Sequence, residues 1–278
     1  MITAEHLHKS YKEHPALSDI SLTIQDGDLY GIAGLNGAGK STLLSILSGL
    51  IPPDKGTVCY DGTDIFSKKV PPHLRIGFVP QELALFQDLL VIENLEFWAW
   101  SGSPKTKTDA QNNARNAAIQ SGLEHTLKKK VSSLSGGMKR RVNIASALAM
   151  NPDVLIMDEP TVGLDIKNRR DIMRFIRSLA RSPLTAEKNS DGVRDGSGAR
   201  GMTVLITSHQ SGELETFCDR LLLLHQGKKI YEGCVGDIFR TAPFIQCRAS
   251  GMSAAEHSGD FPKLESVDDI LYHLDHFL

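Results

Sequence analysis

One segment in the first fifth of the chain constrains the fold most, because it matches the phosphate-binding pattern Gly-x-x-x-x-Gly-Lys-Ser/Thr. The segment consists of Gly34, Leu35, Asn36, Gly37, Ala38, Gly39, Lys40, Ser41 and Thr42. An apolar run at 29–33 predicts a strand before it, and apolar residues at helical spacing over 43–47 predict a helix after it. The alternative is a glycine-rich turn that merely joins a strand to a helix, but the strand and the helix are the context that the phosphate-binding motif needs. We therefore predict a strand–loop–helix unit that binds a nucleoside triphosphate.

The residues of this segment are expected to contact phosphate in different ways. Glycines let backbone N–H groups turn toward phosphate oxygens, because a Cβ would oppose such a close approach. The helix that begins near Lys40 adds the positive end of its dipole. We expect Lys40 to reach the β- and γ-phosphates, and the Ser41 hydroxyl to take one position on a magnesium ion.

Length, charge and hydropathy exclude several classes of protein. A chain of 278 residues can bury one large core and carry an appendage. A net charge of −2 argues against a nucleic-acid partner, which favours a basic surface. No apolar run approaches the roughly 20 residues that span a bilayer, and no secretory signal is recognised. We expect a cytoplasmic protein whose cysteines are reduced packing residues without metal-ligand spacing, namely Cys59, Cys218, Cys234 and Cys247.

Hydrophobic patterning divides the chain into sheet-forming and helix-forming parts. Strands are predicted in several antiparallel pieces over 2–33, and at 56–60, 75–79, 154–157, 203–207 and 220–232. A helical subdomain is predicted over 82–151, with further helices at 167–181, 211–217 and 265–277. Residues 182–201 and 250–260 are polar, and the first of these stretches is predicted to be a flexible surface insertion.

This order of elements predicts an α/β fold. We expect a P-loop NTPase with a mixed or parallel central sheet, an N-terminal antiparallel β subdomain and an inserted α-helical subdomain. The ATPase domain is predicted to span 1–240, and a tail with a short helix to span 241–278.

Two carboxylates follow the apolar strand predicted at 154–157. Parallel sheets deliver such residues to the crevice at the carboxyl ends of their strands. Asp158 is therefore expected to hold magnesium, and Glu159 to polarise an attacking water. The alternative is that one or both only cap the turn at Pro160, which the phosphate-binding loop makes less attractive.

A second glycine-containing segment comes directly before an amphipathic helical run. It consists of Leu134, Ser135, Gly136, Gly137 and Met138. Exposed N–H groups at a helix start form an anion site, although such a helix cap is common by itself. Its place between the two nucleotide motifs makes it the most discriminating feature of the chain. Arg140 and Arg141, which follow, are expected either on a solvated face or on the face of the helix that this segment begins, not as catalytic groups.

Taken together, these motifs resemble the nucleotide-binding subunit of ATP-binding cassette (ABC) transporters over roughly residues 2 to 236. The resemblance implies that Tyr11 stacks on adenine, although a plain strand-end tyrosine is an alternative. It also implies that Gln81 touches magnesium and that Asp165 lies in the loop that crosses between paired cassettes. His209 matches the histidine near the γ-phosphate, whereas a lone histidine elsewhere would more often be structural.

The resemblance further implies how such a subunit works. Two cassettes would sandwich two ATP molecules head to tail, with Lys40 of one copy and the Ser135 segment of the other at the same γ-phosphate. The expected partners are a second ABC ATPase subunit, in a homodimer, and a polytopic membrane permease that holds the chain at the cytoplasmic face. The groove for the permease is expected between Gln81–Leu89 and Phe97–Trp100, although those aromatic residues could equally be packed core.

Within the family, the motifs are similar to bacterial drug and sodium exporters, so export is the expected direction. Met138 and Leu35 depart from the commonest residues of the wider family, but neither removes a backbone group that binds phosphate. A soluble ABC ATPase that acts on a macromolecular assembly is the alternative function. A kinase or nucleotide-dependent switch is a third, but it would not explain the segment at 134–138.

Overall fold

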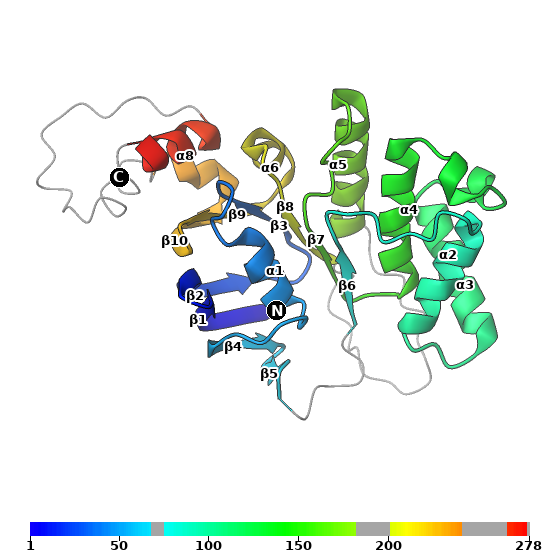
Figure 1. The fold of residues 1–278 in the computed structure, drawn as a ribbon, viewed down its shortest axis with the longest axis horizontal. Helices are drawn as coiled ribbons and strands as arrows, with labels where there is room; N and C mark the ends of the chain where they lie inside the picture. Colours follow the sequence, from blue (N-terminus) through cyan, green and yellow to red (C-terminus); the bar gives the residue numbers. More distant parts are fainter. Residues whose placement is uncertain (68–74, 182–200, 241–265, 277–278) are drawn as a thin grey trace, which may run out of the picture.

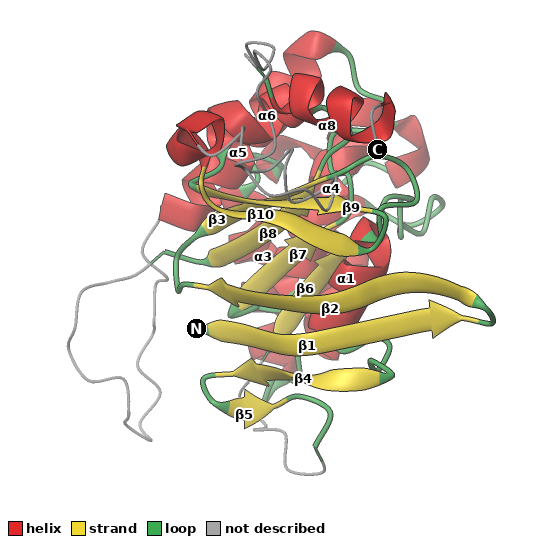
Figure 2. Cartoon of the chain, turned by 90° about the vertical axis from the view of Figure 1, so that its left-hand side faces the viewer, coloured by secondary structure: helices red, strands yellow, loops and turns green. Residues whose placement is uncertain are grey.

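A computed structural model describes residues 1–67, 75–181, 201–240 and 266–276 of the chain (Figure 1). The described strands form two sheets, one with four strands and one with six. Figure 2 shows the four-stranded sheet as a layer of its own, below the larger sheet and the helices α5, α6 and α8.

The four-stranded sheet is antiparallel and has the order β2-β1-β4-β5. Its strands are β1 (Ile2–Tyr11), β2 (His14–Ile24), β4 (Lys55–Tyr60) and β5 (Thr63–Asp64). The side chains of Ile2, Ala4 and Leu7 are buried on one face, and the change of spacing after Ala4 coincides with a register shift in the pairing of β1 with β2. This sheet is the antiparallel β subdomain that the sequence predicts.

The six-stranded sheet has the order β10-β9-β3-β8-β7-β6 and is parallel except for β10. Its strands are β3 (Leu29–Ala33), β6 (Ile76–Val79), β7 (Val154–Met157), β8 (Thr203–Thr207), β9 (Arg220–His225) and β10 (Lys228–Cys234). Several antiparallel strands are predicted over 2–33; β1 and β2 pair in that way, whereas β3 pairs in parallel with β8 and β9, which corrects the prediction for this strand. All five residues of β3 are buried, as in the centre of a parallel sheet with both faces covered.

Two hydrophobic cores cover the two faces of this sheet, and alternate residues of each central strand enter different cores. In β7, Val154 and Ile156 pack with α1 (Lys40–Leu47) and the smaller sheet, whereas Leu155 and Met157 pack with the other helices. Because side chains alternate along a strand, a strand buried on both faces must be apolar throughout. This explains the unbroken apolar runs in the sequence.

The helical subdomain is inserted between β6 and β7, as predicted, and lies at one end of the molecule in Figure 1. It contains α2 (Val91–Ser101), α3 (Lys107–Gln120) and α4 (Gly136–Ala149), with short 3-10 turns at Glu124–Thr126 and Val131–Ser133. One face of α3 is lined by buried alanines, whose small side chains allow close helix packing: Ala110, Ala114, Ala117 and Ala118.

Three further helices cover the sheet: α5 (Ile166–Arg181), α6 (Ser211–Phe217) and α8 (Val267–His276). The C-terminal helix α8 lies near α6 at the opposite end from the helical subdomain in Figure 1. The Val267 N–H donates to Glu215 Oε1 at 2.7 Å, and Ile270 is fully buried. A short 3-10 turn, Val235–Asp237, precedes the gap before α8.

Some predictions differ from the structure or lie beyond what it describes. Cys218 is buried as expected, but Cys234 is exposed, so the prediction that it is a packing residue is wrong. Cys247, nearly all of the predicted insertion at 182–201, and the polar stretch at 250–260 lie outside the described residues. None of the helices in the described part of the chain is long and apolar enough to cross a membrane.

Candidate nucleotide site at the carboxyl edge of the sheet

The phosphate-binding loop joins the end of β3 to the start of α1, as the sequence predicts. Two of its glycines are required by close packing: a Cβ on Gly34 would lie 2.5 Å from the Leu224 carbonyl oxygen, and one on Gly39 would lie 2.5 Å from that of Ala16. Gly39 also has φ +101°, which favours glycine. The Gly227 N–H donates to the Ala38 carbonyl at 3.1 Å, so the turn between β9 and β10 holds the loop from outside.

Lys40 begins α1 and is buried. Its Nζ donates to the carbonyl oxygens of Gly34 at 2.7 Å and Leu35 at 3.1 Å. Burial lowers the pKa of Lys40, while the negative charges of Glu159 and Asp158 oppose that shift. The lysine therefore lies within the field of both predicted carboxylates.

Asp158 and Glu159 follow β7, and both are more than nine-tenths buried. Asp158 Oδ1 accepts a hydrogen bond of 2.6 Å from the Thr207 hydroxyl. Glu159 Oε1 forms an ion pair with His209 Nε2, and Glu159 Oε2 is buried without a hydrogen-bond partner among the described residues. Burial raises the pKa of Glu159, and the charges of His209 and Lys40 counteract this. These contacts do not support the alternative that the two carboxylates only cap the turn at Pro160.

His209 lies just beyond the end of β8, the strand next to both β3 and β7. Its side chain is partly exposed while its ring meets the buried Glu159. The parallel strands thus bring His209, Glu159 and Lys40 to one edge of the sheet.

Gln81 follows β6, and its side chain is exposed. Its backbone carbonyl accepts a hydrogen bond of 2.7 Å from Arg140 Nη2, and that of Pro80 accepts one of 3.2 Å from Arg140 Nη1. Arg140 lies on α4, the helix that follows the segment at 134–138, and is only 4% exposed, so of the two faces expected for it the solvated one is wrong. The guanidinium instead ties α4 to the loop that carries Gln81. Arg141 stacks over the Phe175 ring, 5.3 Å from its centroid.

The segment at 134–138 forms the start of α4, as predicted. Ser135 is the N-cap, and its hydroxyl lies 3.4 Å from the Met138 N–H that donates to it. Leu134 is buried, whereas Ser135 and Gly136 are exposed, and a Cβ on Gly137 would lie 3.0 Å from Asn168 Oδ1.

Asp165 lies just before α5 and is held by Asn168. Its carboxylate accepts from the Asn168 N–H at 2.9 Å and from Asn168 Nδ2 at 2.6 Å, and these bonds lower the pKa of Asp165. Asn168 therefore bonds to Asp165 and lies close to Gly137 within one chain. In Figure 1, α4 and α1 lie on different sides of α5, so the structure does not bring the Ser135 segment to the phosphate-binding loop of the same chain.

Tyr11 lies at the tip of the β1–β2 hairpin, where it pairs with His14. Its side chain is exposed, and adenine stacking stays a prediction.

The structure also reveals polar residues that the sequence did not single out. Thr207 bonds to the Asp158–Glu159 pair, and Glu213 Oε2 accepts from the Thr161 and Ser208 hydroxyls at 2.8 and 3.1 Å. A hydroxyl residue at the end of an apolar strand was the available signal for Thr207.

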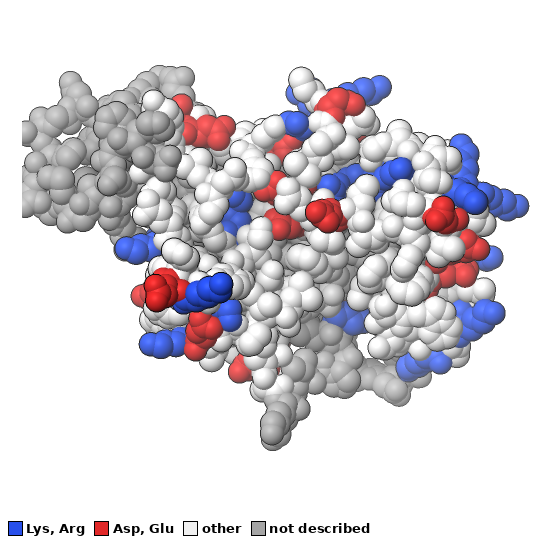
Figure 3. Space-filling model, in the orientation of Figure 1, with Lys and Arg blue, Asp and Glu red and all other residues white. Residues whose placement is uncertain are grey.

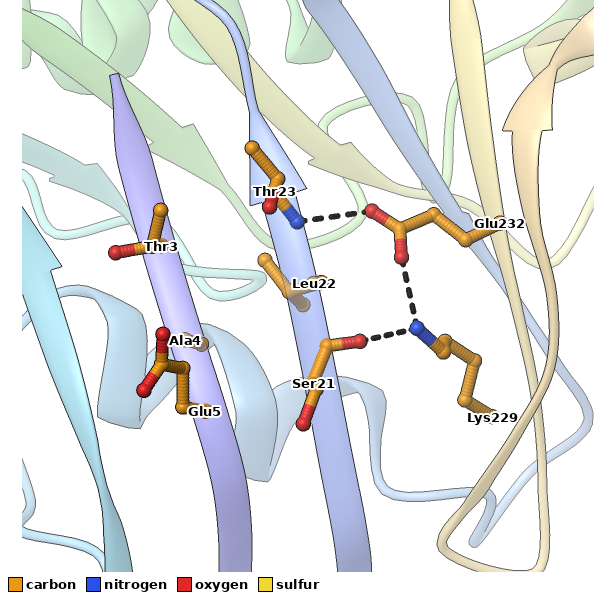
Figure 4. A pocket seen from close by; sticks show the side chains of 8 residues that line it. All are labelled: Thr3, Ala4, Glu5, Ser21, Leu22, Thr23, Lys229 and Glu232. Carbon is orange, nitrogen blue, oxygen red and sulfur yellow. Dashed lines mark hydrogen bonds and ion pairs between the residues drawn. The ribbon is translucent and has the colours of Figure 1, made fainter.

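A pocket of about 270 Å³ lies away from this edge, between β1, β2 and β10 (Figure 4). Its Glu232 accepts hydrogen bonds from the Thr23 N–H at 2.9 Å, the Tyr30 hydroxyl at 3.1 Å and Lys229 Nζ at 2.9 Å. These polar groups satisfy one another and join the two sheets. The pocket is a structural junction, and the chemistry lies at the carboxyl edge instead.

Comparisons with known proteins agree with this geometry. A family model described as "ABC transporter" matches residues 17–162, and a second model, described as an AAA domain, matches residues 122–215. The chain is 36% identical over 258 residues to the linearmycin resistance ATP-binding protein LnrL of Bacillus subtilis, covering 92% of this chain and 77% of LnrL. It is 38% identical over 233 residues to the Nod factor export ATP-binding protein I of Burkholderia lata, covering 84% and 70% of the two chains.

A solved structure is also similar. The dimeric, post-hydrolysis state of the ATP-binding cassette MJ0796, bound to ADP and Pi, aligns with a TM-score of 0.68 and 28% identity. The alignment covers 84% of this chain and 99% of MJ0796. The family model and the relatives span the phosphate-binding loop, the carboxylate pair and the segment between them. The chain therefore belongs to the ABC transporter family, as an ATP-binding subunit that hydrolyses ATP.

Proposed function

We propose that the chain works at the cytoplasmic face of a membrane as one of two identical ATPase subunits that drive export through a separate permease. The observation that carries this proposal is the buried cluster at the sheet edge. There, Lys40 and His209 surround Glu159, whose Oε2 has no hydrogen-bond partner among the described residues. An unpaired buried carboxylate oxygen is costly, and a bound water would satisfy it.

Magnesium fits the oxygen donors at this edge. Asp158 has one carboxylate oxygen bound to Thr207, which leaves the other for a metal or its water. Ser41 adds an exposed hydroxyl and Gln81 an exposed amide. No group of three His, Cys, Asp or Glu side chains able to hold a metal occurs among the described residues. This agrees with magnesium, which is usually held by one or two protein oxygens together with substrate phosphates and water. When bound, the ion would neutralise charge on those phosphates.

The proposed chemistry is phosphoryl transfer from ATP to water. Glu159 orients the water and accepts its proton at Oε2, while the water oxygen bonds to the γ-phosphorus and the bond to the leaving ADP oxygen breaks. Lys40 stabilises negative charge on the phosphates, and His209 holds Oε1 of Glu159 in place.

A second copy would complete the site. Ser135 and Gly136 are exposed at the start of α4, where they can meet the nucleotide of another subunit. The loop around Asp165 also exposes apolar side chains, because Val162 and Ile166 are 39% and 81% accessible. A head-to-tail partner would cover these residues. Likeness to the dimeric MJ0796 cassette supports this arrangement.

The permease would dock on the helical subdomain. Among the large apolar side chains exposed there, four lie in the two segments expected to border the groove, and we call them the aromatic patch: Phe86, Leu89, Phe97 and Trp100. The Phe86 and Phe97 rings pack edge to face with centroids 4.8 Å apart. Such exposure disfavours the alternative that these residues are packed core. Relatives named for resistance and for Nod factor export support the export direction.

The alternative, a soluble ABC ATPase that acts on a macromolecular assembly, has less support. On the face shown in Figure 3, Lys and Arg are interspersed with Asp and Glu, and no continuous basic surface suited to nucleic acid is seen. Co-purification with a polytopic membrane protein would distinguish transport from this alternative.

ATP hydrolysis by Glu159→Gln tests the proposed site. We expect turnover to fall by roughly 100-fold or more, because general bases typically contribute that much, while ATP binding persists. Glu124→Gln serves as the control, since Glu124 is exposed in the helical subdomain and should leave turnover unchanged. Hydrolysis at the wild-type rate by Glu159→Gln would show that Glu159 is not the water-activating residue.

A further inference from the structure

Thr207 is the last residue of β8 and is completely buried beside the two carboxylates. Its hydroxyl makes two hydrogen bonds in opposite senses. Oγ1 donates its proton to Asp158 Oδ1 at 2.6 Å, and it accepts the backbone N–H of Glu159 at 2.9 Å. Thr207 Oγ1 thus bonds to both Glu159 and Asp158, which precede it in the sequence by 48 and 49 positions.

The bond to the Glu159 N–H holds an unfavourable backbone conformation. Glu159 has φ +48°, a region that residues other than glycine rarely adopt and that costs of order 1 kcal/mol or more. Such a conformation persists only where the surrounding contacts enforce it. Thr207 supplies one of these contacts, and the direction in which Glu159 leaves the strand depends on it.

The bond to Asp158 fixes the orientation of its carboxylate. Because Oδ1 accepts a hydrogen bond from the Thr207 hydroxyl, rotation of the carboxylate would break a short hydrogen bond to a charged group. The second carboxylate oxygen is thereby left in a defined direction. Without the hydroxyl, the Glu159 N–H and Asp158 Oδ1 would both lose a partner in a buried environment.

We propose that Thr207 is a positioning residue for ATP hydrolysis, whose hydroxyl sets the Asp158 carboxylate and the Glu159 backbone in their working geometry. The inference rests on the proposed roles of those two carboxylates. Thr207 itself touches neither water nor phosphate in this scheme, because its side chain is fully buried and its hydroxyl is bound to Asp158 and to the Glu159 N–H.

Two substitutions separate the hydroxyl from the volume of the side chain. Thr207→Val keeps the shape and removes the hydroxyl, whereas Thr207→Ser keeps the hydroxyl. The matched control is Thr203→Val, at the other end of the same strand, where a buried hydroxyl accepts the Gly27 N–H at 3.0 Å. Thr203→Val also removes a buried hydrogen bond, but far from the carboxylates.

We expect Thr207→Val to lower kcat by roughly 10- to 100-fold, because small displacements of catalytic groups cost that much. Thr207→Ser should keep kcat within about threefold of wild type, and Thr203→Val should lower the melting temperature without lowering kcat. Calorimetry gives a readout independent of turnover: in Thr207→Val, ATP affinity should fall in magnesium but not in EDTA.

Each other outcome decides against the inference. If Thr207→Val hydrolyses ATP at the wild-type rate while Glu159→Gln does not hydrolyse it, Thr207 has no positioning role and the proposed function stands. If Thr207→Ser is as slow as Thr207→Val, the hydroxyl is not the important group. If Glu159→Gln is fully active, the proposed site and this inference both fail. Should Thr207→Val not fold, Thr207→Ala carries the same expectations.

Discussion

At the scale of single residues, the site holds the Glu159 carboxylate in an environment that does not favour the stability of the fold. Glu159 is buried with a raised pKa, although its Oε1 forms an ion pair with the partly exposed His209 and the charge of Lys40 lies nearby. Burying a carboxylate costs free energy unless it is fully paired. Such cost is typical of catalytic positions, where a group is held in a state that suits the reaction and not the stability of the fold.

The pH dependence of stability follows from this burial. Because the folded-state pKa of Glu159 is raised above its unfolded value, its contribution to stability is complete below the ordinary carboxyl pKa of about 4.3 and is lost as pH rises through the folded pKa. We therefore expect Glu159→Gln to melt at a higher temperature than wild type at neutral pH, with the gain vanishing near pH 4. Thermal unfolding across this pH range is the measurement. A Gln variant that is no more stable than wild type at neutral pH would contradict it.

At the scale of elements, α2 shows how one helix serves the core and the surface. Val91, Leu95 and Ala99 lie on its buried face, whereas Phe97 and Trp100 are exposed. The buried residues recur every four positions and account for the packing of the helix. Phe97 packs edge to face against Phe86 and Trp98, yet it stays exposed, as does Trp100, which favours a docking role.

Charge reversal in the aromatic patch tests that role. We expect the double variant Phe97→Glu, Trp100→Glu to fold and to hydrolyse ATP in isolation like wild type, because the buried face of α2 is untouched. Its recovery with the membrane fraction should be lost. Ile119→Glu, an exposed apolar position on α3 outside the patch, provides the control and should keep membrane recovery. Equal membrane recovery of all three proteins would contradict docking through the patch.

Local sequence signals predicted most elements, but not how distant ones meet. The bounds of β8 and α6 agree with the predictions at 203–207 and 211–217, because hydrophobic spacing and flanking polar residues mark them locally. The parallel pairing of β3 depends on strands more than 170 residues away. The burial of Arg140 likewise depends on carbonyl groups of Pro80 and Gln81, about 60 positions earlier.

The residues of the candidate site also divide into those that local motifs predict and those that depend on contacts between distant elements. Lys40 and the two carboxylates were predicted from motifs, since each motif lies at the end of a strand. The role of the Thr207 hydroxyl could not be predicted, because it depends on the register of β8 beside β7. The exposure of Cys234 could not be predicted either, because it depends on which side of the edge strand β10 faces solvent.

At the scale of the whole molecule, the nucleotide motifs lie in two separate parts of the chain. The phosphate-binding loop, the carboxylates and His209 gather at the edge of the six-stranded sheet. The Ser135 segment lies on the helical subdomain, beyond α5 from α1 (Figure 1). Hydrophobic cores cover both faces of the six-stranded sheet, and one of them continues into the helical subdomain, so closing this separation within one chain would disrupt extensive packing. A second copy of the chain can supply the missing half.

The most direct measurement is the mass of Glu159→Gln in solution, by light scattering during size-exclusion chromatography. With ATP and magnesium, we expect a particle of about twice the 30.4 kDa of one chain, and with ADP a single chain. A single chain that holds one ATP, together with wild-type hydrolysis that does not depend on protein concentration, would contradict a site shared between two copies.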